Sequence, residues 1–154
     1  MVGLDLSPAA VEAASRDSRA QGALLGAAFV LGDATRMPFH DGLFDVVLDK
    51  ATLDVRVAWM RMLQSQATDP LSVIPQSLDC VGSSEAAAAE MWRVLRPGGM
   101  LVSITCRSAA ERAGVLAGAF AVEGSHDVWA EGPRAPCPSY CVIVFRRRDH
   151  CGAS

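Results

Sequence analysis

The chain has 154 residues, about half of them apolar (51%), which is the composition of one globular domain rather than of a disordered segment. Its formal charge of −3 gives no reason to expect nucleic acid or an anionic membrane surface as a partner, and no apolar run reaches the roughly eighteen residues of a membrane-spanning helix. The five cysteines lack paired CxxC spacing, so we expect no metal site and no disulfide framework, and a reduced, cytoplasmic protein is the default.

The first predicted elements are a strand, a helix and a second strand. Residues 2–6 form a short apolar run, and Ser7-Pro8 then supplies a helix N-cap with proline at the first helical position. Residues 9–20 are rich in strong helix formers and contain no glycine or proline, which predicts a helix. Residues 27–31 are predicted to be the second strand, which ends at Gly32-Asp33.

The rest of the chain continues this alternation. Residues 44–49 have the continuous apolar centre of a strand that is buried on both faces. Ser84 is a predicted cap for a helix over residues 85–95, which the Pro-Gly-Gly turn at 97–99 ends. The remaining predicted elements are a strand over 100–105, a helix over 108–118 and closing strands over 120–123 and 140–145, with an arginine run at 146–148 that we expect to be a solvated strand end.

Strands that alternate with helices predict right-handed βαβ units, and therefore the α/β class with a mostly parallel sheet and helices on both faces. We expect the strands over 2–6, 27–31, 44–49 and 100–105 to be parallel, with 140–145 antiparallel near one edge. Residues 1–150 are assigned to this one domain and residues 151–154 to a tail.

Three of the predicted strands end in an acidic residue: Asp5, Asp33 and Asp49. Ligands of open α/β sheets bind beyond the carboxyl ends of the strands, and an ionised carboxylate there accepts hydrogen bonds from ribose hydroxyls or an exocyclic amine. One such acid more often begins a loop or caps the next helix, whereas three on successive strands favour a ligand site. We therefore expect the three acids to lie along one edge.

Four motifs resemble those of class I S-adenosylmethionine-dependent methyltransferases, in the order of that family. They are residues 2–7 (VGLDLS), 32–39 (GDATRMPF), 44–49 (FDVVLD) and 93–101 (RVLRPGGML). The resemblance implies a Rossmann-like fold and S-adenosyl-L-methionine as the cofactor. It also implies that Asp5 holds the ribose, that Asp33 and Ala34 meet the adenine, that Asp49 lies beside the transferred methyl group, and that Leu6 is a further cofactor contact.

A narrower resemblance lies in residues 48–54 (LDKATLD), which are similar to the LDKGTLD-type signature of the elongation-factor-1-alpha lysine methyltransferase group. Ala51 stands where that group usually has glycine. The similarity implies that Lys50, Thr52 and Asp54 line the mouth of a substrate-binding site, and that the substrate is a protein such as a translation elongation factor. The alternative is that Lys50 is a surface residue and Thr52 a helix cap. Methyl transfer needs a neutral amine and in-line positioning more than a strong base, so no catalytic residue is assigned.

Two departures from the family pattern are expected to matter. The family's first strand and its G-x-G-x-G loop, which wraps the methionine end of the cofactor, would precede Val2. We therefore expect an N-terminally truncated domain that binds S-adenosyl-L-methionine weakly or not at all. Residues 55–79 exceed the usual connection at this point, and Ser77-Leu78-Asp79 nearly repeats Thr52-Leu53-Asp54, so we predict an insertion there.

Other functions stay open on the sequence alone. The cofactor motifs do not report the methyl acceptor, so a small-molecule methyltransferase is one alternative. A catalytically inactive fragment or interaction module is another, and the missing glycine-rich loop favours it. A nicotinamide enzyme fits less well, because the Pro-Gly-Gly turn and the strand-end acids match methyltransferases better.

Overall fold

The computed structural model describes residues 1–20, 27–54, 84–128 and 140–149, and every strand and helix predicted from the sequence in these ranges is present. The predicted insertion at 55–79 and the predicted tail at 151–154 lie outside the described residues. In chain order the elements are β1 (Val2–Asp5), α1 (Pro8–Ala20), β2 (Ala28–Leu31), β3 (Phe44–Lys50), α3 (Ser84–Val94), β4 (Leu95–Thr105), α4 (Ala109–Leu116), β5 (Phe120–Val128) and β6 (Tyr140–Arg147).

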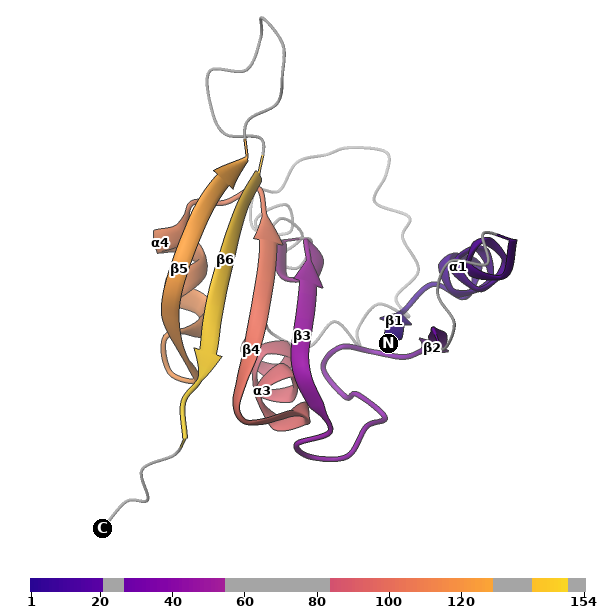
Figure 1. The fold of residues 1–154 in the computed structure, drawn as a ribbon, viewed down its shortest axis with the longest axis horizontal. Helices are drawn as coiled ribbons and strands as arrows, with labels where there is room; N and C mark the ends of the chain where they lie inside the picture. The colour runs from indigo at the N-terminus through magenta and orange to yellow at the C-terminus, as the bar shows by residue number, and fades with distance from the viewer. Residues whose placement is uncertain (21–26, 55–83, 129–139, 150–154) are drawn as a thin grey trace, which may run out of the picture.

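The α/β class is confirmed, but the described strands form two sheets instead of one. β1 and β2 pair in parallel, and the four-stranded sheet has the order β3-β4-β6-β5. In the larger sheet β3 and β4 are parallel, whereas β6 runs antiparallel to both of its neighbours, as expected for a strand near one edge. Figure 1 shows the small sheet and α1 standing to one side of β3. No described strand joins β1 to β3.

The hydrophobic core lies between one face of the larger sheet and the helices α3 and α4, which both lie behind that sheet in Figure 1. Alternate residues along β4 and β6 point into it, because successive side chains of a strand face opposite ways. The apolar stripe of α3 has helical spacing and covers these strands. The most buried members are Leu53, Ala87, Met91, Leu95, Leu101, Leu116, Phe120, Ile143 and Phe145.

The opposite face of the larger sheet is apolar, and no described helix covers it (Figure 1). Val102 and Ile104 of β4 and Val144 of β6 are only half-buried there. On the edge strand β3 the side chains of Val46 and Leu48 are 46% and 62% exposed. Parallel sheets are normally covered on both faces, so this face and edge are unusual for a sheet with parallel strands.

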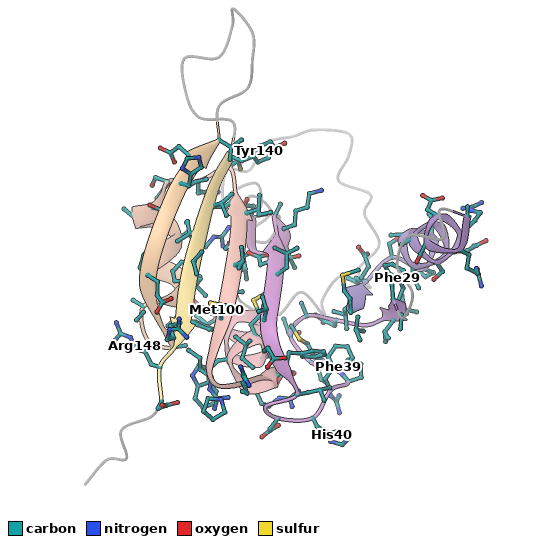
Figure 2. The ribbon with its side chains drawn as sticks, viewed as in Figure 1. Phe29, Phe39, His40, Met100, Tyr140 and Arg148 are labelled. Atoms are coloured by element: carbon teal, nitrogen blue, oxygen red, sulfur yellow. The ribbon has the colours of Figure 1, made fainter. Side chains whose placement is uncertain are left out.

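The segment between β2 and β3 is tied to α3 by two charged side chains. Glu90 accepts a hydrogen bond from the Met37 amide (2.7 Å), and Arg93 donates to the Phe39 carbonyl (2.7 Å) and the Met37 carbonyl (3.0 Å). Arg93 also pairs with Glu90 and with Asp41. The segment that connects the two sheets is therefore held against α3 by these hydrogen bonds. Phe39 and His40, which are labelled in Figure 2, belong to this segment.

The arginine run at the end of β6 has protein partners. Arg146 pairs with Glu123 of β5 and donates to the Gly98 carbonyl (2.8 Å). The Arg147 guanidinium lies 3.7 Å from the centre of the Trp92 ring, and the Trp92 indole donates to the Arg148 carbonyl (2.9 Å). Tyr140 and Arg148 lie at opposite ends of β6 in Figure 2. Arg146 and Arg148 are nevertheless exposed, as expected of a solvated strand end, whereas Arg147 is half-buried.

β5 continues five residues beyond the predicted end at Glu123, as far as Val128. β6 offers it a partner along this whole length, from Arg147 opposite Phe120 to Tyr140 opposite Val128. The register shifts between Val122 and Gly124, as at a β-bulge. Cross-strand pairing thus extended a strand whose own sequence pattern was short.

Candidate functional site

Asp5 and Leu6 lie at the carboxyl end of β1, the position where α/β sheets bind ligands. One oxygen of Asp5 accepts the Ser7 amide (2.8 Å), and the Ser7 hydroxyl accepts the Ala10 amide (3.3 Å), so this turn caps α1. Within the described part of the chain nothing donates to the second Asp5 oxygen. The Leu6 side chain beside it is 51% exposed.

Asp33 and Ala34 are brought next to Asp5 by the parallel pairing of β1 and β2. The Gly32 amide donates to the Asp5 carbonyl (2.9 Å), which fixes the two strand ends side by side. Asp33 accepts the Thr35 amide (2.8 Å) and so begins a turn. Ala34 is half-buried and packs against the core. The structure therefore gathers four of the five predicted cofactor contacts at one edge of the small sheet.

The small sheet also carries a cavity of about 290 Å³, which includes Asp5 in its wall. Its lining is otherwise apolar and comes from β1, from Ala10 and Val11 of α1, and from Phe29 of β2. A side chain on Gly3 would approach the Phe29 ring to 2.7 Å, so glycine is required for the ring to pack across β1. A free carboxylate oxygen beside exposed apolar surface fits a ribose hydroxyl next to a purine ring.

Asp49, the fifth predicted contact, is the last residue but one of β3 in the larger sheet and is buried (1% exposed). One of its oxygens accepts the amides of Thr52 (3.1 Å) and Leu53 (3.4 Å), and the other accepts the Ser103 hydroxyl (2.8 Å). Burial raises the pKa of Asp49, although the Ser103 hydrogen bond opposes that shift. Asp49 therefore starts the helical turn after β3 and joins it to β4.

The turn after Asp49 contains the predicted substrate residues Lys50 and Thr52, which are both exposed. Ala51 between them has φ +60°, the left-handed region that glycine adopts more easily. Its amide donates to the Ile104 carbonyl (3.0 Å), and its carbonyl accepts the Asp54 amide (3.1 Å). The backbone thus explains why glycine suits this position of the motif.

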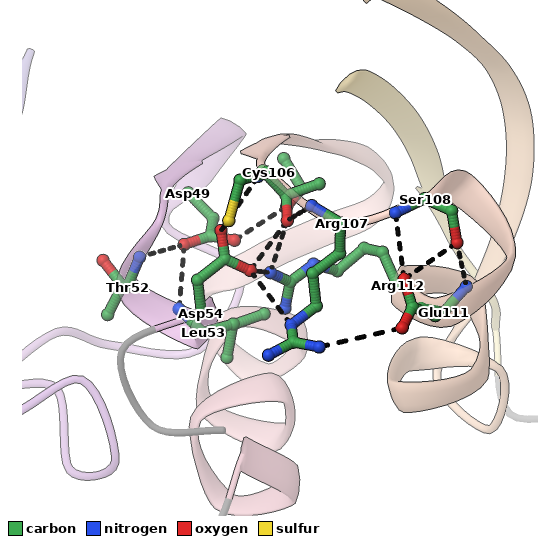
Figure 3. Close-up of polar contacts among 11 residues, drawn as sticks. Asp49, Thr52, Leu53, Asp54, Cys106, Arg107, Ser108, Glu111 and Arg112 are labelled. Atoms are coloured by element: carbon green, nitrogen blue, oxygen red, sulfur yellow. Dashed lines mark hydrogen bonds and ion pairs between the residues drawn. The ribbon is translucent and has the colours of Figure 1, made fainter. Parts of the chain in front are cut away.

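Asp54, the third predicted substrate residue, points into the protein and is 7% exposed. Figure 3 shows its carboxylate surrounded by donors from β4 and α4. It accepts the Thr105 hydroxyl (2.7 Å), the Cys106 amide (3.2 Å) and the guanidinium of Arg112, a side chain with no exposed surface. Sequence analysis missed Arg112, because a helical arginine among alanines and glycine predicts a solvated position.

A second cavity, of about 340 Å³, lies at the carboxyl end of β4. The residues that line it are 106–109, Ser125, Asp127 and Cys141. The Cys106 thiol lies 3.6 Å from Asp54, so the cavity adjoins the turn after β3. Burial, together with the neighbouring Asp127 carboxylate, raises the pKa of the Cys141 thiol. The described residues include no group of three metal-ligating side chains and no helix with the length and apolarity to cross a bilayer.

Solved structures with this fold include S-adenosylmethionine-dependent enzymes. A SAM-dependent methyltransferase from Methanosarcina mazei superposes with a TM-score of 0.62 at 17% identity, over 95% of this chain and 81% of its own. The N-methyltransferase NodS from Bradyrhizobium japonicum gives 0.61 at 16% identity over 96% and 73%, and it has also been solved with S-adenosyl-L-homocysteine. Together with the match of residues 1–129 to a methyltransferase-domain family, these structures indicate S-adenosyl-L-methionine as the cofactor.

The fold alone does not fix the reaction. The [4+2]-cyclase SpnF superposes with a TM-score of 0.64 at 18% identity, and this chain spans 65% of its length. The sequence gives the more specific result, because residues 1–129 match a methyltransferase-domain family. The chain therefore belongs to the methyltransferase-domain family.

Proposed function

We propose that this chain is the greater part of an S-adenosylmethionine-dependent methyltransferase that acts on the side-chain amine of a protein lysine. The observation that carries the proposal is the edge formed by Asp5, Leu6, Asp33 and Ala34, which offers a carboxylate acceptor beside apolar surface. These residues would hold the adenosine part of the cofactor. The cofactor would supply the methyl group, and the protein would bind and orient both reactants.

The lysine acceptor is supported by the turn after β3. Lys50, the last residue of β3, and Thr52 in the turn are both exposed. Asp127 lines the neighbouring cavity, where a carboxylate can attract a cationic side chain before its amine loses a proton. The resemblance of residues 48–54 to the elongation-factor-1-alpha lysine methyltransferase group supports a translation elongation factor as the substrate. A small-molecule amine is the second candidate, and the shared fold of the N-methyltransferase NodS favours it.

We further propose that a preceding segment completes the domain with a strand between β1 and β3. Each of these strands pairs with a single described neighbour, so one edge of each has no described partner. The exposed Val46 and Leu48 side chains of β3 and the 65% coverage of SpnF support the same proposal. Each buried backbone group that stays unpaired costs about 1–3 kcal/mol, so the added strand would contribute stability as well as cofactor binding.

Titration calorimetry with S-adenosyl-L-homocysteine tests the cofactor site. The present chain should bind weakly or not at all, and a chain extended upstream in its own gene should bind. In the extended chain, Asp5→Ala should weaken binding by about 1–3 kcal/mol, because hydrogen bonds to a charged acceptor are lost. Asp17→Ala, which removes an exposed acid of α1, is the matched control. Micromolar binding by the present chain, or equal affinities for the extended chain and its Asp5→Ala variant, would contradict the proposal.

The acceptor is tested by mass spectrometry of products from the extended chain. Purified translation elongation factor 1-alpha and free lysine are offered separately, each with S-adenosyl-L-methionine. Methylation of a lysine in the elongation factor alone is the expected result. Methylation of free lysine alone would replace the protein acceptor with a small molecule, while methylation of neither would remove the support for an amine acceptor.

A further inference from the structure

The turn after β3 holds a strained residue at the edge where the proposed acceptor arrives. Ala51 is the only residue besides glycine with positive φ in the described part of the chain. A left-handed conformation is unfavourable for alanine, because its Cβ comes too close to the following carbonyl oxygen. Strain of this kind persists only where the surroundings over-determine the backbone, and it concentrates at functional sites.

Two buried carboxylates hold this turn from its two ends. Asp49 precedes Ala51 and accepts the amides of Thr52 and Leu53, while its other oxygen accepts the Ser103 hydroxyl. Asp54 follows Ala51, and its own amide closes the turn on the Ala51 carbonyl (3.1 Å). Fixing both ends leaves the intervening backbone little freedom to leave the left-handed region.

The anchor for the far end comes from distant parts of the chain. The Asp54 carboxylate accepts the Thr105 hydroxyl and the Cys106 amide at the end of β4, together with the Arg112 guanidinium from α4. Arg112 also donates to the Thr105 hydroxyl (3.0 Å), so Asp54, Thr105 and Arg112 contact one another, and Arg107 Nε lies 3.9 Å from the same carboxylate (Figure 3). The Nε and Nη1 atoms of Arg112 are buried without a partner among the described residues, so this cation depends on Asp54.

We propose that Asp54 is a positioning residue, which uses Arg112 and Thr105 to hold Ala51 in its left-handed conformation. The held turn presents Lys50 and Thr52 at the strand edge, as the proposed function requires of a site that orients an acceptor amine. Asp54 itself does not touch the acceptor, because its carboxylate faces into the protein. This role in methyl transfer rests on the proposed function, whereas control of the turn by Asp54 does not.

The test is nuclear magnetic resonance on the full chain, labelled with ¹⁵N and ¹³C. The three-bond coupling between the Ala51 α proton and the Lys50 carbonyl carbon distinguishes positive from negative φ, and hydrogen exchange of the Thr52 and Leu53 amides reports the turn. In Asp54→Asn the Ala51 coupling should leave its left-handed value and the two amides should exchange about tenfold faster or more, while those of β4 and β6 stay protected. Asp45→Asn, an exposed acid at the start of β3, should change neither.

A second variant covers the case in which Asp54→Asn unfolds, because the unpaired Arg112 charge would then be buried. Asp54→Leu with Arg112→Met removes both charges at similar volume and should keep the sheet folded. Its Thr52 and Leu53 amides should exchange about tenfold faster than those of the parent, or more, while those of β4 and β6 stay protected. Adding Ala51→Gly should return the exchange rates of these two amides to within about threefold of the parent rates, because glycine adopts positive φ without steric strain.

The outcomes separate a positioning role from a merely structural one. If the folded double variant keeps both amides protected, or if Ala51→Gly fails to restore protection, Asp54 does not control the turn and the proposal is overturned. Exchange needs neither cofactor nor acceptor, so failure of the proposed function would leave this result unchanged. Absence of methyl transfer by the extended parent chain, with the turn responding to the Asp54 variants as expected, would count against the proposed function alone.

Discussion

The strand-end acids share a local geometry but differ in burial, and that difference separates their roles. Asp5, Asp33 and Asp49 each accept a backbone amide two or three residues further on. Capping and ligand binding are therefore compatible for Asp5, which is exposed and keeps an oxygen for a ligand. Both oxygens of Asp49 already have protein donors, so its predicted contact with the cofactor stays a prediction.

The buried charge of Asp49 leads to a pH prediction. Burial raises its pKa above the usual 3.8, so the folded state binds more protons than the unfolded state between 3.8 and the raised value. Stability should therefore fall as pH rises through this window. Asp49→Asn keeps an oxygen for the Thr52 and Leu53 amides and has no charge, so it should be at least as stable as the parent at pH 7.

Urea unfolding at a series of pH values measures this effect. The free energy of unfolding of the parent should fall as pH rises from 3.8 through the raised pKa of Asp49, and that of Asp49→Asn should change less over this pH range. Asp45→Asn, which replaces an exposed acid on the same strand, should follow the parent. A loss of more than about 1 kcal/mol in Asp49→Asn at pH 7 would mean that the ionised carboxylate contributes net stability through its hydrogen bonds.

The strained turn predicts that a glycine substitution stabilises the protein, whereas replacing alanine with glycine usually destabilises it. Ala51→Gly should raise the free energy of unfolding by about 0.5–1 kcal/mol, because relief of left-handed strain exceeds the added entropy of the unfolded chain. Gly98→Ala is the matched control: φ is +69° there and no atom lies within 4 Å of the added Cβ. It should lower stability by about 1 kcal/mol, through backbone strain alone. Equal signs for the two changes would rule out this explanation.

At the scale of elements, α3 links the two sheets. It covers the core side of the larger sheet, and its Glu90 and Arg93 fasten the segment that leads from β2 to β3. The T-shaped contact between Phe39 and Phe44, with ring centres 5.1 Å apart, reinforces the end of that segment. The relative position of Asp5 and Asp49 therefore depends on a helix that contains neither residue.

Arg93→Met tests this link. It should lower the free energy of unfolding by about 2–3 kcal/mol, because charged hydrogen bonds to two carbonyls are lost. Arg96→Met removes an exposed pair with Asp45 and should stay within about 0.5 kcal/mol of the parent in urea unfolding. The hydrogen bond from Arg93 also lowers the pKa of Glu90 below its usual 4.5, so the parent loses this contribution as pH falls through the lowered value. The stability of Arg93→Met should consequently depend less on acidic pH than that of the parent. Equal losses of unfolding free energy in Arg93→Met and Arg96→Met would contradict the role of Arg93 in fastening this segment to α3.

At the scale of the whole molecule, the described residues leave Val46 and Leu48 of the edge strand β3 exposed, and they leave one apolar face of the larger sheet half-buried. An uncovered edge strand with exposed aliphatic residues is a site for pairing with another chain. The present chain should therefore associate with itself as its concentration rises. The same exposure would disappear in a domain completed by a further strand.

Leu48→Lys tests this property by sedimentation velocity. A charge on the edge strand should reduce association, because a charged edge opposes strand pairing. Leu43→Lys is the control, since Leu43 is similarly exposed (54%) but lies in the loop before β3. Equal reduction by both changes would assign the association to general apolar exposure instead of the strand edge.

The sequence by itself determined the α/β class, the order of the elements and the family. Periodicity, caps and Pro-Gly turns are local signals, so the strands around Val46 and Val102 and the helix around Met91 were predictable. The motifs at residues 2–7 and 32–39 likewise predicted a cofactor site at the carboxyl ends of the first two strands, with S-adenosyl-L-methionine as the cofactor. The lysine acceptor, a translation elongation factor and a cytoplasmic location stay predictions, because cofactor motifs do not encode the acceptor.

Only the tertiary structure decided which side chains meet. Thr105 and Arg112 lie 51 and 58 residues from Asp54 in sequence, and nothing in their own segments marks them as its partners. We attribute the left-handed conformation of Ala51 to that packing. Asp49 is buried against a different partner, Ser103, which lies 54 residues away in sequence. The division into two sheets was likewise absent from the local pattern, because a strand's sequence encodes its faces but not which neighbour pairs with its edges.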